Sequence, residues 1–137
     1  MTATYEKIIK YIDDNISEEI FAYCLRGVTY YELGETEKSE EEFDNSIKFA
    51  KDLAQAYGQR AAMYCHHVKQ PEKAIEDYTK AIELDPNRTC LYSNRASCYT
   101  RMKQPEKAIE YFNKALELDP DLKEARECLD RILRNKN

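Results

Sequence analysis

The side chains best suited to chemistry lie in one short segment. Cys65, His66 and His67 are consecutive and include the only two histidines among the 137 residues. Thiolates and imidazoles bind zinc, and a cysteine beside a histidine can act as a nucleophile. A zinc site needs further ligands at a suitable spacing, and neither Cys65 nor Cys90 has a recognisable partner to orient a catalytic histidine. We therefore expect no metal, no cofactor and no enzyme activity.

Composition and charge argue against several other classes. The five cysteines are an odd number without CxxC spacing, which indicates free thiols in a reducing compartment. The sequence shows no secretory signal, and its apolar runs are far shorter than a membrane span. Residues 1–53 carry a net charge of −7 and residues 54–137 one of +2, without the basic stripe that nucleic acid requires. We expect a cytoplasmic protein that binds neither nucleic acid nor a membrane.

The elements that must position these residues repeat along the chain. The segment KQPEKAIE at 69–76 recurs unchanged at 103–110, a shift of 34, and AIELDP recurs as ALELDP at the same shift. Upstream, Tyr57 corresponds to Tyr92 at a shift of 35. The earlier unit therefore contains one extra residue between its halves, within 65–70. A loop absorbs an insertion that would rotate the apolar face of a helix, so we predict a turn there.

Within each unit the apolar residues have helical spacing. Ile109, Phe112 and Leu116 follow steps of three and four residues, which predicts a helix with one buried face. Prolines stand where a unit's second helix should begin and just after it should end, at Pro71, Pro105, Pro86 and Pro120. The first unit has Lys51 in place of the closing proline, so we expect its second helix to run on toward Leu53. With only three glycines, the composition favours an all-α fold.

Three contiguous units, 20–53, 54–88 and 89–122, resemble the tetratricopeptide repeat family. The family's small residues at helix crossings have counterparts at Gly27, Ala61, Ala96, Ser39, Ala74, Ala108, Ser46, Ala81 and Ala115, and its bulky positions at Tyr23, Tyr57, Tyr92, Tyr30, Tyr64, Tyr99, Phe43, Tyr78 and Phe112. A small residue lets two helices approach closely, and an aromatic ring fills the neighbouring space. The resemblance implies an α-solenoid of three helix-turn-helix repeats.

The ends of such a stack expose apolar faces unless something covers them. Apolar stripes run along both ends of the chain, at Tyr5, Ile8, Ile9, Ile12 and Ile16, and at Leu122, Ala125, Leu129, Ile132 and Leu133. We expect residues 1–19 to supply an N-terminal capping helix and residues 123–137 a C-terminal solvating helix. Docking of another subunit on either stripe is the alternative.

In the family, the first helices of the repeats line a concave groove. Carried over to this sequence, the resemblance places a peptide-binding site at Phe21, Cys24, Val28, Tyr31, Gln55, Gly58, Ala62, His66, Cys90, Asn94, Ser97 and Arg101. This surface is aromatic, small and mostly uncharged, which suits an extended segment or an apolar helix. We expect a non-catalytic protein-interaction adaptor that acts as a monomer, with a self-associating scaffold as the alternative.

A second alternative is a co-chaperone-like binder of a C-terminal carboxylate. The segment LYSNRA at 91–96 is similar to the middle unit of the family's carboxylate clamp, with Asn94 at the clamp asparagine. The flanking units offer Ala62 and Gly58 before it, and Glu124 and Cys128 after it, where the clamp has cations and amides. A carboxylate needs charge-assisted donors to offset its desolvation, so the sequence argues against this function.

Overall fold

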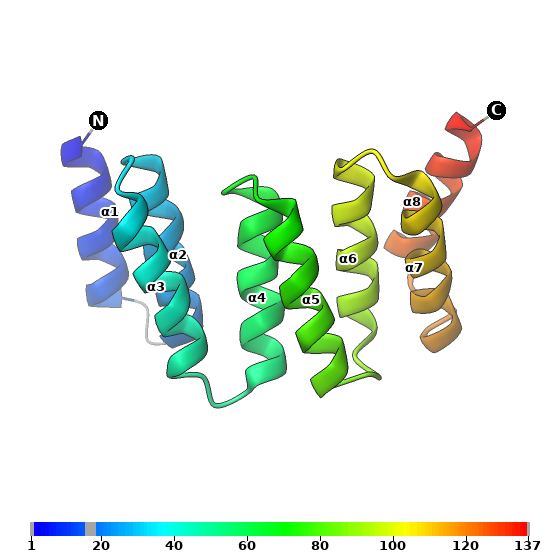
Figure 1. The fold of residues 1–137 in the computed structure, drawn as a ribbon, viewed down its shortest axis with the longest axis horizontal. Helices are drawn as coiled ribbons and strands as arrows, with labels where there is room; N and C mark the ends of the chain where they lie inside the picture. Colours follow the sequence, from blue (N-terminus) through cyan, green and yellow to red (C-terminus); the bar gives the residue numbers. More distant parts are fainter. Residues whose placement is uncertain (1, 16–18, 137) are drawn as a thin grey trace.

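The structure is a computed structural model that describes residues 2–15 and 19–136. Within these residues it contains helices and no strands (Figure 1). The helices are α1 (Thr2–Asn15), α2 (Glu19–Glu32), α3 (Thr36–Lys48), α4 (Leu53–His66), α5 (Pro71–Leu84), α6 (Thr89–Arg101), α7 (Pro105–Leu118) and α8 (Lys123–Asn135). Three antiparallel pairs, α2/α3, α4/α5 and α6/α7, follow one another along the long axis of the molecule, with α1 and α8 at the ends. The chain is thus an all-α solenoid with three repeats, as the sequence predicted.

The helix boundaries follow local chemistry. Pro71 and Pro105 are the first residues of α5 and α7, where a missing backbone N–H costs nothing. The prediction that the second helix of the first unit continues to Leu53 is wrong, because α3 ends at Lys48. Four residues later Asp52 starts a new helix by accepting a hydrogen bond from the backbone N–H of Gln55 at 3.0 Å. The first unit thus lacks a closing proline, and a side-chain N-cap marks the start of the helix that follows it.

The turns inside the three repeats share one conformation. Gly34, Lys69 and Lys103 occupy equivalent positions after the first helix of each pair, and all three have a positive φ, of 79°, 54° and 59°. Glycine adopts this left-handed region without strain, whereas lysine does so at a cost. The turn after α4 is one residue longer than the turn after α6, as the insertion predicted. Val68 in this turn is fully buried, and its equivalent Met102 also packs against the core.

Helix crossings inside the repeats are tight. In the first unit a Cβ built on Gly27 would come within 2.8 Å of the ring of Phe43, and the hydroxyl of Ser39 donates to the carbonyl of Gly27 at 2.7 Å. Ala61 and Ala96, the equivalents of Gly27, are fully buried in the second and third units. The small residues therefore let the two helices of each hairpin pack closely, and aromatic rings fill the space beside them.

A network of charged groups joins the first unit to the second. Arg60 of α4 holds Asp77 of α5 with two hydrogen bonds, of 2.7 and 2.9 Å, and also reaches Asp44 of α3 at 3.3 Å. Lys73 of α5 lies 3.3 Å from Glu40 of α3. The Asp77 and Arg60 side chains are only 4% and 14% exposed, whereas Asp44 is 73% exposed. The buried ion pair therefore lies inside the second unit, and the charged contacts that cross from it to the first unit, to Asp44 and Glu40, are more exposed to solvent.

The junction between the second and third units is apolar. A Cβ on Gly58 of α4 would lie 2.8 Å from a methyl group of Leu91 of α6, so the two helices approach closely. Leu91 and Cys98 of α6 are buried in the same cluster as Cys65 of α4. Arg95, the equivalent of Arg60, lies over the ring of Tyr111 with its guanidinium carbon 4.3 Å from the ring centroid. Inside the third unit, Tyr111 thus takes the place that the carboxylate of Asp77 has inside the second.

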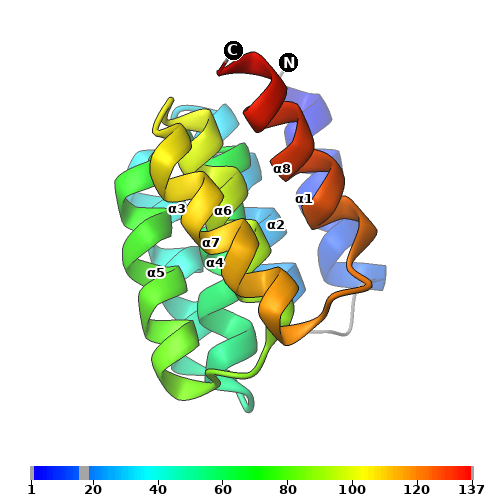
Figure 2. The same cartoon turned by 90° about the vertical axis from the view of Figure 1, so that its right-hand side faces the viewer.

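Both terminal helices pack against the stack. Ile12 of α1 is buried, whereas Ile8 is 41% exposed, and Ile16 lies outside the described residues. On α8, Leu129 and Ile132 are buried in the core cluster of the third unit. Figure 2, a view along the stack, shows α1 and α8 on the same side of the repeats. No helix in the described part of the chain is both long and apolar enough to cross a membrane.

Candidate functional site

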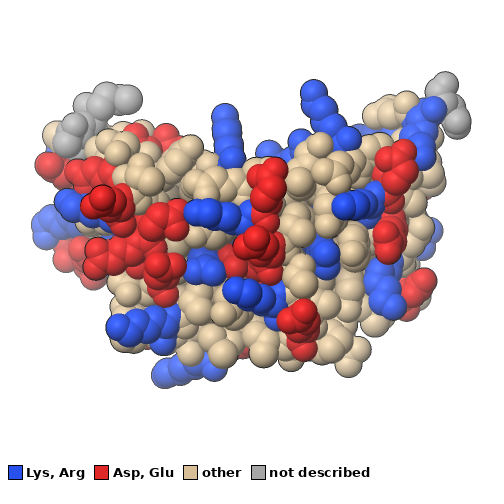
Figure 3. All heavy atoms as spheres, viewed as in Figure 1, with Lys and Arg blue, Asp and Glu red and all other residues tan. Residues whose placement is uncertain are grey.

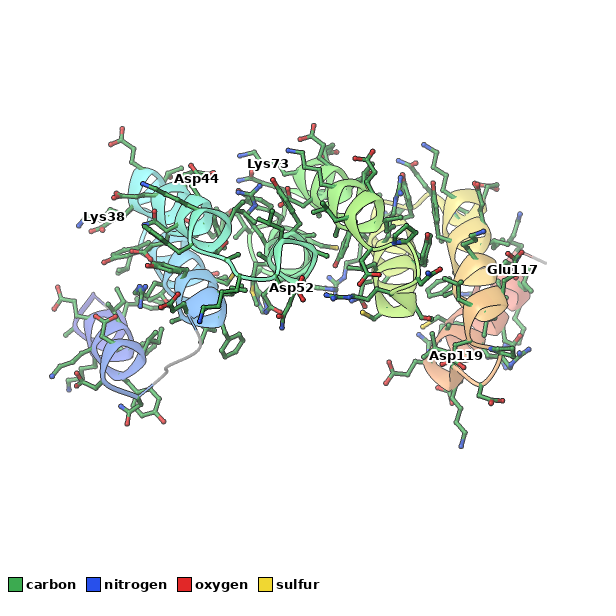
Figure 4. The ribbon with its side chains drawn as sticks, turned by 90° about the horizontal axis from the view of Figure 1, so that it is seen from below. Lys38, Asp44, Asp52, Lys73, Glu117 and Asp119 are labelled. Carbon is green, nitrogen blue, oxygen red and sulfur yellow. The ribbon has the colours of Figure 1, made fainter. Side chains whose placement is uncertain are left out.

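The first helices of the repeats form one face of the molecule. Figure 4 shows α2, α4 and α6 side by side in a row, with α1 and α8 projecting beyond them at either end. The second helices α3 and α5 lie on the opposite side, where the labelled Asp44 and Lys73 are found. We call the side on which α1 and α8 project the inner face and the other side the outer face. The predicted peptide site falls on the first helices of all three units.

Helix α6 contributes an accessible stripe to the inner face. Cys90, Asn94, Ser97 and Arg101 are spaced by four, three and four residues, so they lie above one another on one side of the helix. Cys90, Asn94 and Arg101 are exposed and Ser97 is half-buried. All four were predicted site residues, and a ligand lying on the inner face can contact each of them.

Helix α4 has the matching stripe one unit earlier. Gln55 and His66 are exposed, and Ala62 between them is half-buried. Gly58 was also predicted to line the site, but its Cα faces Leu91 of α6, which makes it a packing residue. Gln59, which lines a pocket together with Gln55, takes its place. Sequence reasoning missed Gln59, although it is the repeat equivalent of Asn94 at a shift of 35.

Helix α2 departs further from the prediction. Cys24 is fully buried in the core, where burial raises the pKa of its thiol to about 11, so it does not line the site. The assignment of Cys24 to the site failed for the same reason as that of Gly58. The two residues occupy equivalent positions in successive repeats, and both face the interior. Val28 and Tyr31 are half-buried and pack against the core cluster. Phe21 is 39% exposed and presents an aromatic ring to the solvent.

A hollow of approximately 340 Å³ lies where the first two units meet. We call it the N-terminal hollow, because it lies at the N-terminal ends of α2 and α4; it is lined by Glu19, Ile20, Phe21, Phe49, Lys51, Gln55 and Gln59. Phe21 and Phe49 are both exposed large apolar side chains. Phe49 also stacks on Tyr23, with ring centroids 5.9 Å apart. Aromatic walls with a few amides suit an apolar side chain of a ligand.

A second hollow, of approximately 320 Å³, lies at the other end of the inner face. This C-terminal hollow is lined by His66, Ser97, Thr100, Arg101, Phe112, Cys128, Arg131 and Ile132, which come mainly from α4, α6 and α8. Burial and the positive charge of Arg101 both lower the pKa of His66. In contrast to the first hollow, the polar side chains here include two arginines, two hydroxyls and an imidazole.

Charge is distributed unevenly over the molecule. Figure 3 shows the outer face, with acidic side chains gathered over the N-terminal helices α1 to α3. On the inner face, the last position of the helical stripe reads Glu32 in α2, His66 in α4 and Arg101 in α6. The potential along this edge therefore changes from negative to positive toward α8.

The thiols and histidines lie partly in the core and partly on the surface. Cys65 is buried, and its hydrogen bond with Cys98 lowers the pKa of its thiol. Cys90 is exposed on α6, a helix away from the adjacent pair His66 and His67. In the part of the chain that the structure describes, no three His, Cys, Asp or Glu residues are grouped so that they could hold a metal ion.

These features define the class of the protein: an α-solenoid of stacked helix hairpins with an open inner face. The tetratricopeptide repeat model matches residues 22–53, 54–88 and 90–122. The chain belongs to the tetratricopeptide repeat family.

Similar proteins include organising proteins of heat-shock chaperones. Hsp70-Hsp90 organizing protein 3 of Arabidopsis thaliana is 32% identical over 74 residues, which are 54% of this chain and 13% of that protein. The heat shock protein sti1 homolog of Schizosaccharomyces pombe is 34% identical over 86 residues, which are 63% of this chain and 14% of that protein. The chain thus spans about one seventh of the length of these curated relatives.

Solved structures share the fold at lower identity. The first repeat domain of Spaghetti (RPAP3), bound to the HSP90 peptide SRMEEVD, has a TM-score of 0.65 and 22% identity, covering 87% of this chain and 94% of that one. YrrB, described as having an unusual peptide-binding site, has a TM-score of 0.66 and 16% identity, covering 93% of this chain and 66% of that one.

Proposed function

We propose that this chain is a non-catalytic adaptor that holds an extended peptide segment of a partner protein along the inner face of α2, α4 and α6. The observation that carries the proposal is the pair of accessible stripes on α4 and α6, with a hollow at each end. An inner face that only packed against the rest of the fold would not leave amides, a hydroxyl and two hollows open to solvent.

The dimensions of the inner face suit a short peptide. Gln55 of the N-terminal hollow and His66 of the C-terminal hollow are both on α4, eleven residues apart. At 1.5 Å per residue they are separated by about 16 Å along the helix axis. An extended chain rises about 3.3 Å per residue, so a segment that fills both hollows spans at least about five residues.

The similar proteins support a peptide ligand without naming this chain's partner. One structural neighbour holds an HSP90 peptide, and another is described by its peptide-binding site. The chaperone-clamp alternative is weaker for this chain, because Glu124 is exposed on α8 where the clamp has a lysine. An acidic side chain there repels the carboxylate that the clamp must hold.

The test is selection from a random peptide library displayed on phage, using the full chain as bait. The inner-face variant is Gln55→Ala/Asn94→Ala, and the control is Glu76→Ala/Glu110→Ala, which changes exposed residues of α5 and α7. We expect peptides selected by the wild type to bind the control normally and the inner-face variant more weakly. Equal loss of binding in both variants, or loss in the control alone, would contradict the proposal.

A self-associating scaffold is the second candidate, and an observation on α1 favours it. Ile8 and Tyr11 are 41% and 63% exposed on this terminal helix. Paired α1 helices from two copies would cover these side chains. Light scattering over a range of concentrations separates the two candidates: a constant mass near 16.1 kDa supports the adaptor, and a mass that rises toward twice that value supports the scaffold.

A further inference from the structure

Two buried thiols meet across the junction between the second and third units. Helices α4 and α6 run in the same direction (Figure 1) and approach closely where Gly58 faces Leu91. Cys65 and Cys98 each lie seven residues further along, about two helical turns beyond that contact. Parallel helices keep their register over two turns, so the two side chains lie opposite each other. Both are buried in the same cluster, with 5% and 0% of their surface exposed, and a hydrogen bond joins them.

The pair is specific to this junction. At the first junction the equivalent positions, 34 and 35 residues earlier, are Tyr31 of α2 and Met63 of α4. Bulky apolar side chains therefore suffice to pack one first helix on the next, and the repeat framework does not require thiols here. Cysteine packs like a small apolar residue but differs from it in one respect, because two thiols in contact can be oxidised to a disulfide.

A buried hydroxyl lies beside the two thiols. Tyr78 of α5 is fully buried in the same cluster, and its hydroxyl has no hydrogen-bond partner among the described residues. Burial raises the pKa of Tyr78, and Cys65 and Cys98 raise it further, which places the hydroxyl close to both sulfurs. A buried hydroxyl without a partner costs free energy. An oxygen added to either sulfur would give this hydroxyl an acceptor.

The two thiols differ in their readiness to react. The hydrogen bond from Cys98 and the positive charge of Arg101 lower the pKa of Cys65, against the opposing effect of burial. The same hydrogen bond and burial raise the pKa of Cys98, which therefore keeps its proton. Since the thiolate is the nucleophile, Cys65 attacks an oxidant and Cys98 reacts second. Cys65 is in the last turn of α4, directly before the exposed His66, and local opening of a helix end admits a small molecule.

We infer that Cys65 and Cys98 are an oxidation site, at which hydrogen peroxide forms a disulfide between α4 and α6. In the first step the Cys65 thiolate attacks one peroxide oxygen, and the O–O bond breaks to give a sulfenic acid and hydroxide. In the second step the sulfur of Cys98 attacks that of Cys65, and the S–O bond breaks as the thiol proton and the hydroxyl leave as water. The two sulfurs together give two electrons to the peroxide.

The disulfide would change how the repeats are held together. It closes a loop over residues 65–98, which contains all of α5, and it links the second unit covalently to the third. His66 and Ser97, the chain neighbours of the two cysteines, line the C-terminal hollow, so the bond also fixes the spacing of α4 and α6 at this hollow. The inference does not depend on the proposed peptide site.

The test is oxidation of the full chain by hydrogen peroxide under native conditions. Remaining thiols are then blocked with N-ethylmaleimide in urea, and the chain is cut with trypsin and analysed by mass spectrometry. Cleavage after lysine and arginine places each cysteine in a peptide of its own, at 11–26, 61–69, 89–95, 96–101 and 127–131. The variant Cys90→Ser/Cys128→Ser removes the two thiols that are not buried. Cys65→Ala and Cys98→Ala each remove one partner, and Cys24→Ala is the control, since it removes a buried thiol outside the pair.

We expect peptide 61–69 linked to peptide 96–101 as the main disulfide in the wild type, in Cys90→Ser/Cys128→Ser and in Cys24→Ala. The link should be absent from Cys65→Ala and Cys98→Ala, and dithiothreitol should reverse it. Because the disulfide restrains the unfolded chain, the oxidised Cys90→Ser/Cys128→Ser variant should unfold at a urea concentration about 1 M above that of its reduced form.

Other results would overturn the inference. Oxidation of Cys90 at peroxide doses that leave Cys65 and Cys98 as thiols would show that the pair only packs, and a different main disulfide would show that other sulfurs meet more readily. A sulfinic acid on Cys65 beside a free Cys98 would show that the two sulfurs do not come within bonding distance. A urea midpoint that the link leaves unchanged or lowers would mean that the bond does not fit the native junction.

Discussion

The two junctions between successive repeats hold neighbouring units together through different interactions. At the first, Arg60, which is held inside its own unit by Asp77, reaches across to Asp44, and Lys73 reaches Glu40. At the second, the equivalent Arg95 lies over Tyr111 of its own unit, and the contact between units depends on Leu91 and the buried thiols. The repeat framework thus specifies where two helices must meet, while the means of holding them together varies from unit to unit.

The difference predicts unequal responses to the environment. Solvated ion pairs weaken with salt, whereas apolar contacts are strengthened by it. The first unit contacts the second through exposed ion pairs in addition to the ring contact of Phe43 with Tyr64, so we expect it to separate from the stack first when electrostatic interactions are screened. Because neighbouring units supply each other's buried surface, the order of unfolding then follows the junctions.

The largest effect is expected from Asp77→Ala. It leaves the guanidinium of Arg60, which is 14% exposed, without its main partner. We expect the free energy of unfolding to fall by about 3 kcal/mol, measured by urea denaturation. Asp77→Tyr introduces the residue that the third unit has at the equivalent position, and its free energy of unfolding should fall by less. A loss below about 1 kcal/mol for the alanine variant would show that this pair matters no more than an exposed one.

The second junction should respond most to Leu91→Ala. Removing this buried side chain opens a cavity beside α4, and we expect a loss of about 2.5 kcal/mol by the same measurement. The methyl group of Gly58→Ala would occupy space that Leu91 fills in the wild type. The double variant Gly58→Ala/Leu91→Ala should therefore lose less unfolding free energy than the sum of the two single variants. Strict additivity would mean that α4 and α6 do not approach closely here.

Asp52 touches both junctions, since it caps α4 and lies 3.1 Å from Arg88 in the loop before α6. The hydrogen bond from the N–H of Gln55 and the contact with Arg88 lower the pKa of Asp52. This contribution is present above the aspartate's unfolded pKa, near 4, and is lost as the pH falls through the lower folded pKa. We expect Asp52→Ala to cost about 1 kcal/mol at neutral pH. Asp52→Asn should retain the cap and lose the pH dependence. If the free energy of unfolding of this variant fell at acidic pH as it does in the wild type, the assignment would be refuted.

The smallest effect is expected from Glu40→Gln at the solvated edge of the first junction. Glu40 accepts a hydrogen bond from Tyr64 at 3.2 Å and lies 3.3 Å from Lys73. We expect a loss of about 0.5 kcal/mol at low salt that disappears at about 1 M NaCl. Thermal denaturation at both salt concentrations measures it. A loss that persists at high salt would indicate that packing, and not charge, holds this edge.

The sequence predicted the helices, their pairing and the inserted turn because each leaves a local signal. Pro71 and Pro105 mark helix starts, and a shift of one residue between Tyr57 and Tyr92 marks the insertion. It failed where the expected signal is absent. Lys51 takes the place of the closing proline, yet α3 ends at Lys48 and α4 begins after its N-cap Asp52.

The predicted site residues also divide into those with a local signal in the sequence and those without one. The stripe on α6 could be predicted, because Asn94 and Arg101 follow helical spacing from a well-matched unit. Cys24 and Gly58 were misplaced by one residue, which rotates a side chain by about 100° around the helix and moves it from the inner face to the interior. The position of Arg131 in the lining of the C-terminal hollow had no signal in the repeat pattern, since it depends on how α8 lies beside α6.

The series Glu32, His66 and Arg101 has a consequence for how a partner is positioned. A stack of equivalent units offers a ligand several registers that differ by one repeat, and a uniform surface would let it slip between them. Moving one repeat toward the N-terminus takes an acidic group from Arg101 to His66, and a second step brings it to the carboxylate of Glu32, where it is repelled. For a peptide bound as proposed, the graded charges would favour one alignment and one direction over those displaced by a repeat, although the scaffold beneath them is repetitive.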